Sequence, residues 1–376
     1  MKKQIFTLTF FVLAIFASNK LVHAQNLTSA PASCITPTPI AATCIVDDEF
    51  HPMAGQAYSY TVSVPTPSGT KSFNWLVTQD KTFIDNTGLI ASPESKDGTG
   101  DHIATASGTY NAPPGSETVD ITWKAFTHDA SNPVFLVIYV TNDDGSCSTD
   151  NIQVYVIEPV HTFTLDIANL NADGSAVTGA NSSCVSTVQS AIWDATNSAV
   201  TMDYGENYLY FQVVAANFSD SWMPTFQVTG IDLSGTTIAD VAWAYPDAAT
   251  SGPWHTTTEA SNIYTPTDAV EAKDASGTVG ATGECIVVRV HVDHNSDETL
   301  IDIPVKLAVN GIMANPTTGD YTTASYADIH YEADGSGNCP WYDDYTNDFV
   351  THTITARPDI QDATGASSGA TFLPKN

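Results

Sequence analysis

The sequence has few basic residues. Lysine and arginine together number 12 against 42 aspartates and glutamates in 376 residues, and the formal net charge is −30. Three of the 12 basic residues lie in the first 24 positions, so the rest of the chain carries a charge near 9 − 42 = −33. Binding to a phosphate backbone needs clustered Lys and Arg. The composition therefore excludes nucleic acid as a partner.

Helical periodicity is almost absent. Hardly any segment places apolar residues at i, i+3, i+4 and i+7 among helix-forming neighbours. Short runs rich in Val, Ile, Thr, Tyr and Phe alternate instead with clusters of Gly, Pro, Asn and Asp, as in sandwich proteins. The hydrophobic content of 42% is sufficient for folded cores. The sequence predicts an all-β fold made of tandem immunoglobulin-like β-sandwich domains.

Long apolar runs are also scarce, and the clearest lies at the beginning of the chain. Lys2 and Lys3 precede the run from Ile5 to Ala17, and the small-residue site Val22-His23-Ala24 follows before Gln25. This is the pattern of a secretory signal peptide, and the run is too short to span a bilayer. We expect cleavage before Gln25 and a secreted chain, extracellular or on the cell surface, with no membrane span. The periplasm remains an alternative location.

No C-x2-C pair is present, so the six cysteines of this exported chain predict disulfides rather than a metal site. They divide three and three around Pro159. Because neither half can pair all its thiols, one bridge crosses the boundary or one thiol in each half stays free. Cys147 and Cys184 flank the boundary in sequence and are the candidates for a crossing bridge. The full set of disulfide candidates is Cys34, Cys44, Cys147, Cys184, Cys285 and Cys339.

A predicted hairpin marks the end of the first sandwich domain. The runs Val134 to Thr141 and Ile152 to Ile157 flank Asp144-Gly145, which predicts two antiparallel strands around a tight turn. Proline cannot donate to a strand ladder, so Pro159 ends the second strand. The resulting division is a signal peptide over 1–24, a Pro/Thr-rich tail over 25–43, one sandwich over 44–159, a second over 160–358 with a long insertion around 232–284, and a flexible tail over 359–376.

The first of these sandwiches resembles a known kind of domain. Phe73-Asn74-Trp75 stands where PKD-type repeats have an aromatic-x-Trp strand, and the segment from Val137 to Cys147 stands where they have Val-x-Val-Thr-Asp-x-x-Gly-Cys. The region 44–159 therefore resembles the PKD-like and related immunoglobulin-like repeats of secreted surface proteins from Bacteroidota-type bacteria. The Gly-Asp-Gly-type turn of that family is replaced by the segment from Leu76 to Asp80. The resemblance implies a scaffold rather than an activity.

Oxygen-rich loops make calcium the one cofactor that the sequence suggests. Calcium prefers carboxylate and carbonyl oxygens, and an acidic chain supplies them in abundance. The candidate ligands are Asp143, Asp144, Asp297, Glu298, Asp343 and Asp344. The competing interpretation of Asp144-Gly145 is ordinary hairpin chemistry, since Asp and Gly accept the backbone angles that tight turns need.

Two catalytic patterns were weighed and neither holds. Gly365 to Gly369 matches the G-x-S-x-G string of hydrolases, but no strand precedes it and no histidine follows it. His291, Asp293 and His294 are chemically suited to a metal, yet alternation on a strand places His294 on the opposite face from the other two. At most two ligands converge, whereas a catalytic zinc needs three. We therefore expect a chain without enzymatic activity.

Aromatic residues beside Pro, Gly or Asp support the main alternative function. Trp243, Tyr245 and Trp254 could form ring platforms for a polysaccharide, although tryptophan is buried on average. The primary prediction is a structural or adhesive protein whose partners are other surface proteins or copies of itself, assembled through strand addition by the N-terminal tail. Its rivals are a carbohydrate-binding module and, less favoured, an unrecognised secreted hydrolase.

Overall fold

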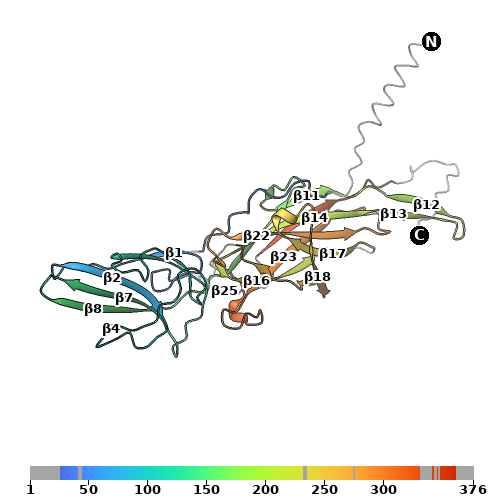
Figure 1. Cartoon of the computed structure of the whole chain (residues 1–376). Helices are drawn as coiled ribbons and strands as arrows, with labels where there is room; N and C mark the ends of the chain where they lie inside the picture. The colour runs from blue at the N-terminus through green and yellow to red at the C-terminus, as the bar shows by residue number, and fades with distance from the viewer. Residues whose placement is uncertain are drawn as a thin grey trace, which may run out of the picture.

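The computed structural model describes residues 26–40, 45–231, 235–273, 276–330, 341–342, 345 and 348–360. Within these residues the secondary structure consists of β-strands and two 3₁₀ helices, η1 (Pro246–Ala248) and η2 (Ala324–Tyr326). No helix among them is long and apolar enough to cross a membrane. The chain is all-β, built from two immunoglobulin-like sandwiches in tandem (Figure 1).

The first sandwich has two three-stranded sheets. One has the order β1 (Ala57–Thr61), β6 (Thr118–Trp123), β5 (Ile103–Ala106), and the other β2 (Thr70–Thr78), β7 (Val134–Asp143), β8 (Ser148–Ile157). In chain order these strands occupy the B, E, D and C, F, G positions of an immunoglobulin domain. The predicted hairpin is confirmed, since β7 and β8 pair antiparallel from Val134 and Ile157 to Asp143 and Ser148.

Its core contains two fully buried tryptophans. Trp75 lies on β2, the strand that carries the buried tryptophan of immunoglobulin domains, and Trp123 lies on β6. Each indole has a polar partner, because Trp75 donates to the carbonyl of Ser116 at 3.0 Å and Trp123 donates to the Tyr60 hydroxyl at 2.9 Å. A short excursion with β3 (Ile84–Asp85) and β4 (Gly88–Leu89) packs on the outer face of the β2–β7–β8 sheet.

The second sandwich repeats the same plan with added strands. One layer has the order β10 (Ala176–Val177), β9 (Thr164–Leu170), β14 (Glu206–Ala216), β22 (Glu284–Asp293), β17 (Thr237–Ala244). The other has the order β19 (Ile263–Pro266), β16 (Ser221–Thr229), β23 (Ile303–Met313), β26 (Phe349–Thr355), β11 (Asn181–Cys184). Strand β11 runs parallel to β26, and the other pairs in both layers are antiparallel.

The hairpin of β18 (His255–Ala260) and β19 joins the two layers. β18 pairs with β17, and β19 pairs with β16, so one side of the sandwich is closed by backbone hydrogen bonds. The insertion predicted around 232–284 is therefore shorter than expected. β17 lies within that range but is a strand of the sheet, and the additional residues are those between β17 and β22. Short pieces complete the unit: β12 (Ser190–Asp194), β13 (Ala199–Asp203), β15 (Phe218–Ser219), β20 (Val270–Glu271), β21 (Thr278–Val279), β24 (Ile329–His330) and β25 (Trp341–Tyr342).

The two sandwiches lie end to end and meet through backbone. A Cβ placed on Gly280 would lie 2.5 Å from the carbonyl oxygen of Gly55. The absence of a side chain at Gly280 therefore lets the backbones of the two sandwiches touch. Ala125 donates its N–H to the Ser219 hydroxyl at 2.7 Å, and the hydroxyls of Thr127 and Tyr326 are hydrogen-bonded to each other across the junction. The molecule is correspondingly elongated (Figure 1).

Candidate functional site

The N-terminal tail crosses the outer face of the second sandwich. Its residues 26–40 pass over β9, β14 and β22, and Leu27 is buried against Leu170, Tyr210 and Val287. Thr28 donates both its N–H and its hydroxyl to the carbonyl of Ala172, at 2.6 and 2.8 Å. The tail therefore covers apolar positions on a face that would otherwise point to water, which explains why β14 is buried on both sides.

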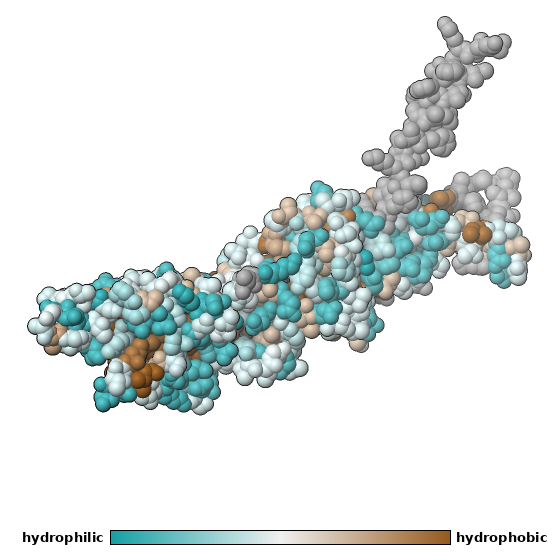
Figure 2. Space-filling model, in the orientation of Figure 1, coloured by the Kyte–Doolittle hydropathy of each residue, from teal (hydrophilic) through white to brown (hydrophobic). Residues whose placement is uncertain are grey.

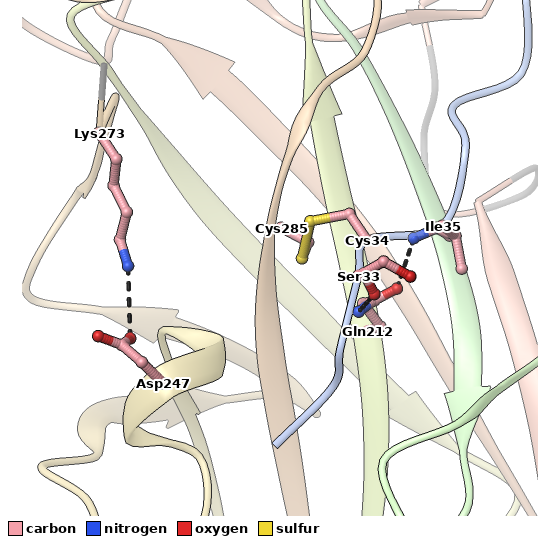
Figure 3. Close-up of a disulfide and its surroundings, with 7 residues drawn as sticks. All are labelled: Ser33, Cys34, Ile35, Gln212, Asp247, Lys273 and Cys285. Atoms are coloured by element: carbon pink, nitrogen blue, oxygen red, sulfur yellow. Dashed lines mark hydrogen bonds and ion pairs between the residues drawn. A yellow bond between two sulfur atoms is a disulfide. The ribbon is translucent and has the colours of Figure 1, made fainter. Parts of the chain in front are cut away.

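Two side chains of the sheet hold the middle of the tail (Figure 3). Cys285 on β22 forms a disulfide with Cys34, with 5.6 Å between their Cα atoms. Beside it, the buried amide of Gln212 accepts the N–H of Ile35 at 2.7 Å and donates to the carbonyl of Ser33 at 3.0 Å. A buried amide is stable only when its hydrogen bonds are made. Gln212 thus fixes the backbone on both sides of the bridging cysteine.

A third contact lies further along the tail. Thr38 donates its N–H and its hydroxyl to the carboxylate of Asp166 on β9. Hydrogen bonds to an ionised carboxylate are stronger than neutral ones. The tail lies across the strands rather than along an edge, and residues 26–40 form no strand of their own.

The cysteine predictions divide accordingly. A bridge does cross the boundary at Pro159, but it joins Cys34 to Cys285. The pairing suggested for Cys147 and Cys184 is wrong, because both are exposed free thiols, one in the β7–β8 turn and the other on β11. Proximity in sequence misled the choice, since the tail folds back over 251 residues. Cys44 and Cys339 lie outside the described residues.

Next to the tail, the same outer face carries a ladder of aromatic and ionic side chains. The Arg289 guanidinium lies over the rings of Tyr208 and Trp254, at 5.5 and 4.7 Å from their centroids. It also pairs with Asp240 at 3.0 Å. The His291 ring stacks on Tyr208 at 4.4 Å, and its Nε2 contacts the carboxylate of Glu206. We call these six residues the aromatic–ionic face. Rings and charged groups presented together on a sheet can stack on and hydrogen-bond a sugar.

The residues proposed as a sugar platform do not form one surface. Trp243 is fully buried and stacks on the His255 ring at 4.0 Å, so its role as an exposed platform is wrong. The Tyr245 hydroxyl accepts the N–H of Glu271 at 3.1 Å, and Lys273 lies over its ring. Only Trp254 belongs to the aromatic–ionic face. Tyr208, Arg289 and His291 were missed because the near-continuous apolar runs of β14 and β22 mask the alternation that turns these three outward.

Three of the predicted calcium ligands accept backbone hydrogen bonds in turns. Asp144 accepts the N–H groups of Ser146 and Cys147 at 2.9 and 2.8 Å, which lowers the pKa of its carboxyl. Asp143 accepts the N–H of Gly145 at 2.8 Å. Asp297 accepts the N–H of Thr299 at 3.0 Å in the other sandwich. Asp343 and Asp344 lie outside the described residues. Across the described ranges, no three His, Cys, Asp or Glu side chains gather as a metal site requires.

Two buried histidines belong to the second core rather than to a catalytic site. His294 Nε2 donates to Asn207 Oδ1 at 2.8 Å and Nδ1 accepts the Thr299 hydroxyl at 3.1 Å, an arrangement that satisfies the neutral ring. Burial lowers the pKa of His294 to about 4. Burial likewise lowers the pKa of His352, which lies 3.0 Å from the Ser183 hydroxyl, to about 4. The string from Gly365 to Gly369 lies outside the described residues.

Comparison with known proteins finds only distant structural similarities. No protein family matches the sequence, and no curated protein is similar to it. Among solved structures, the C-terminal domain of the Streptococcus agalactiae AgI/II polypeptide BspA matches with 12% identity and a TM-score of 0.20, over 54% of this chain and 59% of that one. The chain thus spans well under two thirds of that structure.

Two further structures cover more of the chain. The major pilin subunit BcpA of Bacillus cereus has 8% identity and a TM-score of 0.25 over 66% of this chain and 65% of that one. The collagen adhesin of S. aureus has 7% identity and a TM-score of 0.20 over 77% and 78%. One of these structures is thus a pilin subunit and the other an adhesin. The scores are too low to carry an argument about function, so the function below is argued from the geometry.

Proposed function

We propose that the chain is an exported, non-catalytic structural or adhesive element of the bacterial surface, with a first sandwich of PKD-like type. The observation that carries this is the direct backbone contact at the end-to-end junction, from which we infer a rigid body. Backbone contact between Gly55 and Gly280, with hydrogen bonds from Ala125 to Ser219 and between Thr127 and Tyr326, joins the sandwiches end to end. A fixed elongated body suits a spacer or a fibre subunit that must present a surface at a distance.

The experiment compares two glycine variants by small-angle X-ray scattering. Gly280→Ala places a methyl group against the carbonyl of Gly55 and should loosen the junction while both cores stay folded. Gly108→Ala is the matched control, because nothing lies within 4 Å of its added Cβ. We expect a rigid elongated particle for the native protein and the control, and a distribution of bent shapes for Gly280→Ala. A native particle that already samples bent shapes would refute the rigid-spacer function. Immunogold labelling of intact native cells tests surface location separately.

Strand addition remains the proposed mode of assembly, but we propose that the N-terminal tail is not the strand that is donated. Release of residues 26–40 would break the Cys34–Cys285 bridge, expose Leu27 and leave the buried Gln212 amide unpaired. Unpaired buried amides are costly. We therefore propose that the tail stays on its own chain and that copies or other surface proteins join through open strand edges elsewhere.

A carbohydrate-binding role is the second candidate, and the aromatic–ionic face favours it. Retention on immobilised polysaccharides would test it, with Trp254→Ala and Arg289→Ala removing the stacking surface and Leu300→Ala, an exposed residue on another loop, as the control. Loss of retention only in the first two variants would support this role. Equal retention of all three would remove it.

A further inference from the structure

A two-stranded ribbon projects from the second sandwich. β12 and β13 pair only with each other among the described residues, through Ser190 to Asp203. The ribbon lies at the end of the molecule opposite the first sandwich (Figure 1). Its base is joined to the sandwich, because Tyr204 donates its N–H to the carbonyl of Asn295 at 3.1 Å.

The ribbon exposes large apolar side chains. Ile192 is 64% and Trp193 49% exposed, and Val188 beside the base is also exposed. Brown side chains are visible at this end of the molecule in Figure 2. Isolated two-stranded ribbons are only marginally stable, and tryptophan is normally well buried. As successive strand residues, Ile192 and Trp193 project from opposite faces of the ribbon, so each face exposes a large apolar side chain. Exposed apolar residues, with tryptophan foremost, mark protein interaction surfaces.

An open strand edge lies in the first sandwich. β8 pairs with β7 on one side only, and the N–H groups of Glu158 and Val160 on its other side bond to the carbonyls of Phe50 and Pro52. Because successive N–H groups of a strand alternate in direction, those of Val154 and Val156 point the same way. Within the described part of the chain, no backbone group pairs with these two.

In the second sandwich, the edge of the last strand is paired with an additional strand. There, β11 runs parallel to the last strand β26 and covers its edge. In the first sandwich the equivalent pairing is a single parallel bridge between Met53 and Val160. Further along β8 the sandwich is open, and a groove of about 370 Å³ is lined by Val62, Val64, Ile138 and Val140. Asn142, only 6% exposed, lines the same groove, and its Oδ1 has no hydrogen-bond partner.

We propose that the β12–β13 ribbon of one copy adds β12 to the open edge of β8 in a second copy. One face of the ribbon would then lie beside Ile84, Ile90 and Val156, which are exposed around the same sheet. Figure 2 shows an apolar patch on this part of the first sandwich. The inference rests on the proposed structural function and names its partner, a second copy of this chain.

The geometry requires that second copy. The ribbon projects from the far end of the second sandwich and the β8 edge belongs to the first, so one chain cannot bring them together (Figure 1). A contact between two different surfaces that does not close on itself generates an open filament. Since each copy carries a net charge near −33, the copies repel one another, and salt should strengthen the association by screening.

The test uses the oxidised chain beginning at Gln25, studied by sedimentation velocity over a range of concentrations and salt, with negative-stain electron microscopy. We expect concentration-dependent head-to-tail species, with fibres at high concentration.

The double change Ile192→Ser with Trp193→Ser removes the donor surface. Val154→Pro removes an edge N–H that the β7 ladder does not use, and Val156→Lys is a second acceptor variant that keeps the backbone intact. Ile301→Ser, which alters a residue 60% exposed elsewhere, is the control.

Each donor or acceptor variant should raise the concentration needed for association at least about tenfold, while the control should not. A mixture of one donor variant and one acceptor variant should form dimers that do not grow, because each retains one working surface. A monomeric native protein at all concentrations and salt levels, or an association that all variants share, would overturn the proposal. Neither result would alter the scattering test of the rigid body, so the two failures are distinguishable.

Discussion

Removal of the Cys34–Cys285 bridge should destabilise the second sandwich. In the chain-entropy treatment, a bridge that closes 251 residues restricts the unfolded state by about 5 kcal/mol, and native disulfides typically contribute about 2 to 5 kcal/mol. If the first sandwich stays folded, the flexible loop shortens to about 150 residues. This lowers the figure by only about 0.5 kcal/mol, because loop entropy grows with the logarithm of length.

The assay is denaturant unfolding of Cys34→Ser beside the native protein, read by near-UV signals and by hydrogen exchange on β14. We expect a loss of about 2 to 5 kcal/mol in the second sandwich and faster exchange under residues 26–40, with the first sandwich unchanged. Cys147→Ser and Cys184→Ser are the controls, since both thiols are exposed and unbridged. An unchanged midpoint for Cys34→Ser would mean that the Gln212 and Asp166 contacts alone hold the tail, and would refute the entropic argument.

Four further predictions follow from particular residues. The pKa values of His294 and His352, each lowered to about 4, mean that the unfolded chain binds more protons below pH 6.5. Each histidine should therefore cost about 3 kcal/mol of stability as the pH falls from 6.5 to 4, and His352→Asn should flatten the stability curve measured by urea titration. Millimolar calcium should raise Tm more than sodium at equal ionic strength; equal shifts would indicate screening alone. Thiol titration of the denatured chain should detect fewer than six reactive groups. Mass measurement on protein from native cells should find Gln25 at the N-terminus.

The sequence was sufficient for the fold class because its strongest strands are also the central ones. The β7–β8 hairpin and the runs that became β14 and β22 combine β-branched residues with clear turn signals, and local preference agreed with burial. β17 was missed because Ala239, Ala242 and Ala244 dilute its β-propensity, so the strand is fixed by pairing with β22 instead of by local pattern.

The surfaces could not be predicted in the same way. Whether Trp243 or Trp254 faces solvent depends on which face of a sheet is covered, and neighbours distant in sequence decide that. The position of the tail was equally inaccessible, since the contacts of Ser33 and Ile35 with Gln212 join residues nearly 180 positions apart. A disulfide partner chosen by sequence proximity fails for the same reason.

The path of the chain also determines how the protein bears tension. The tail, held by Cys34, and the last described strand, β26, both belong to the second sandwich, while the first sandwich lies between them in sequence. A pull applied at residue 26 and residue 360 passes from the tail through the bridge into β22. It therefore loads the second sandwich and bypasses residues 45–160. The first sandwich carries none of this force. It can therefore keep its fold and its exposed β8 edge while the second sandwich is under load.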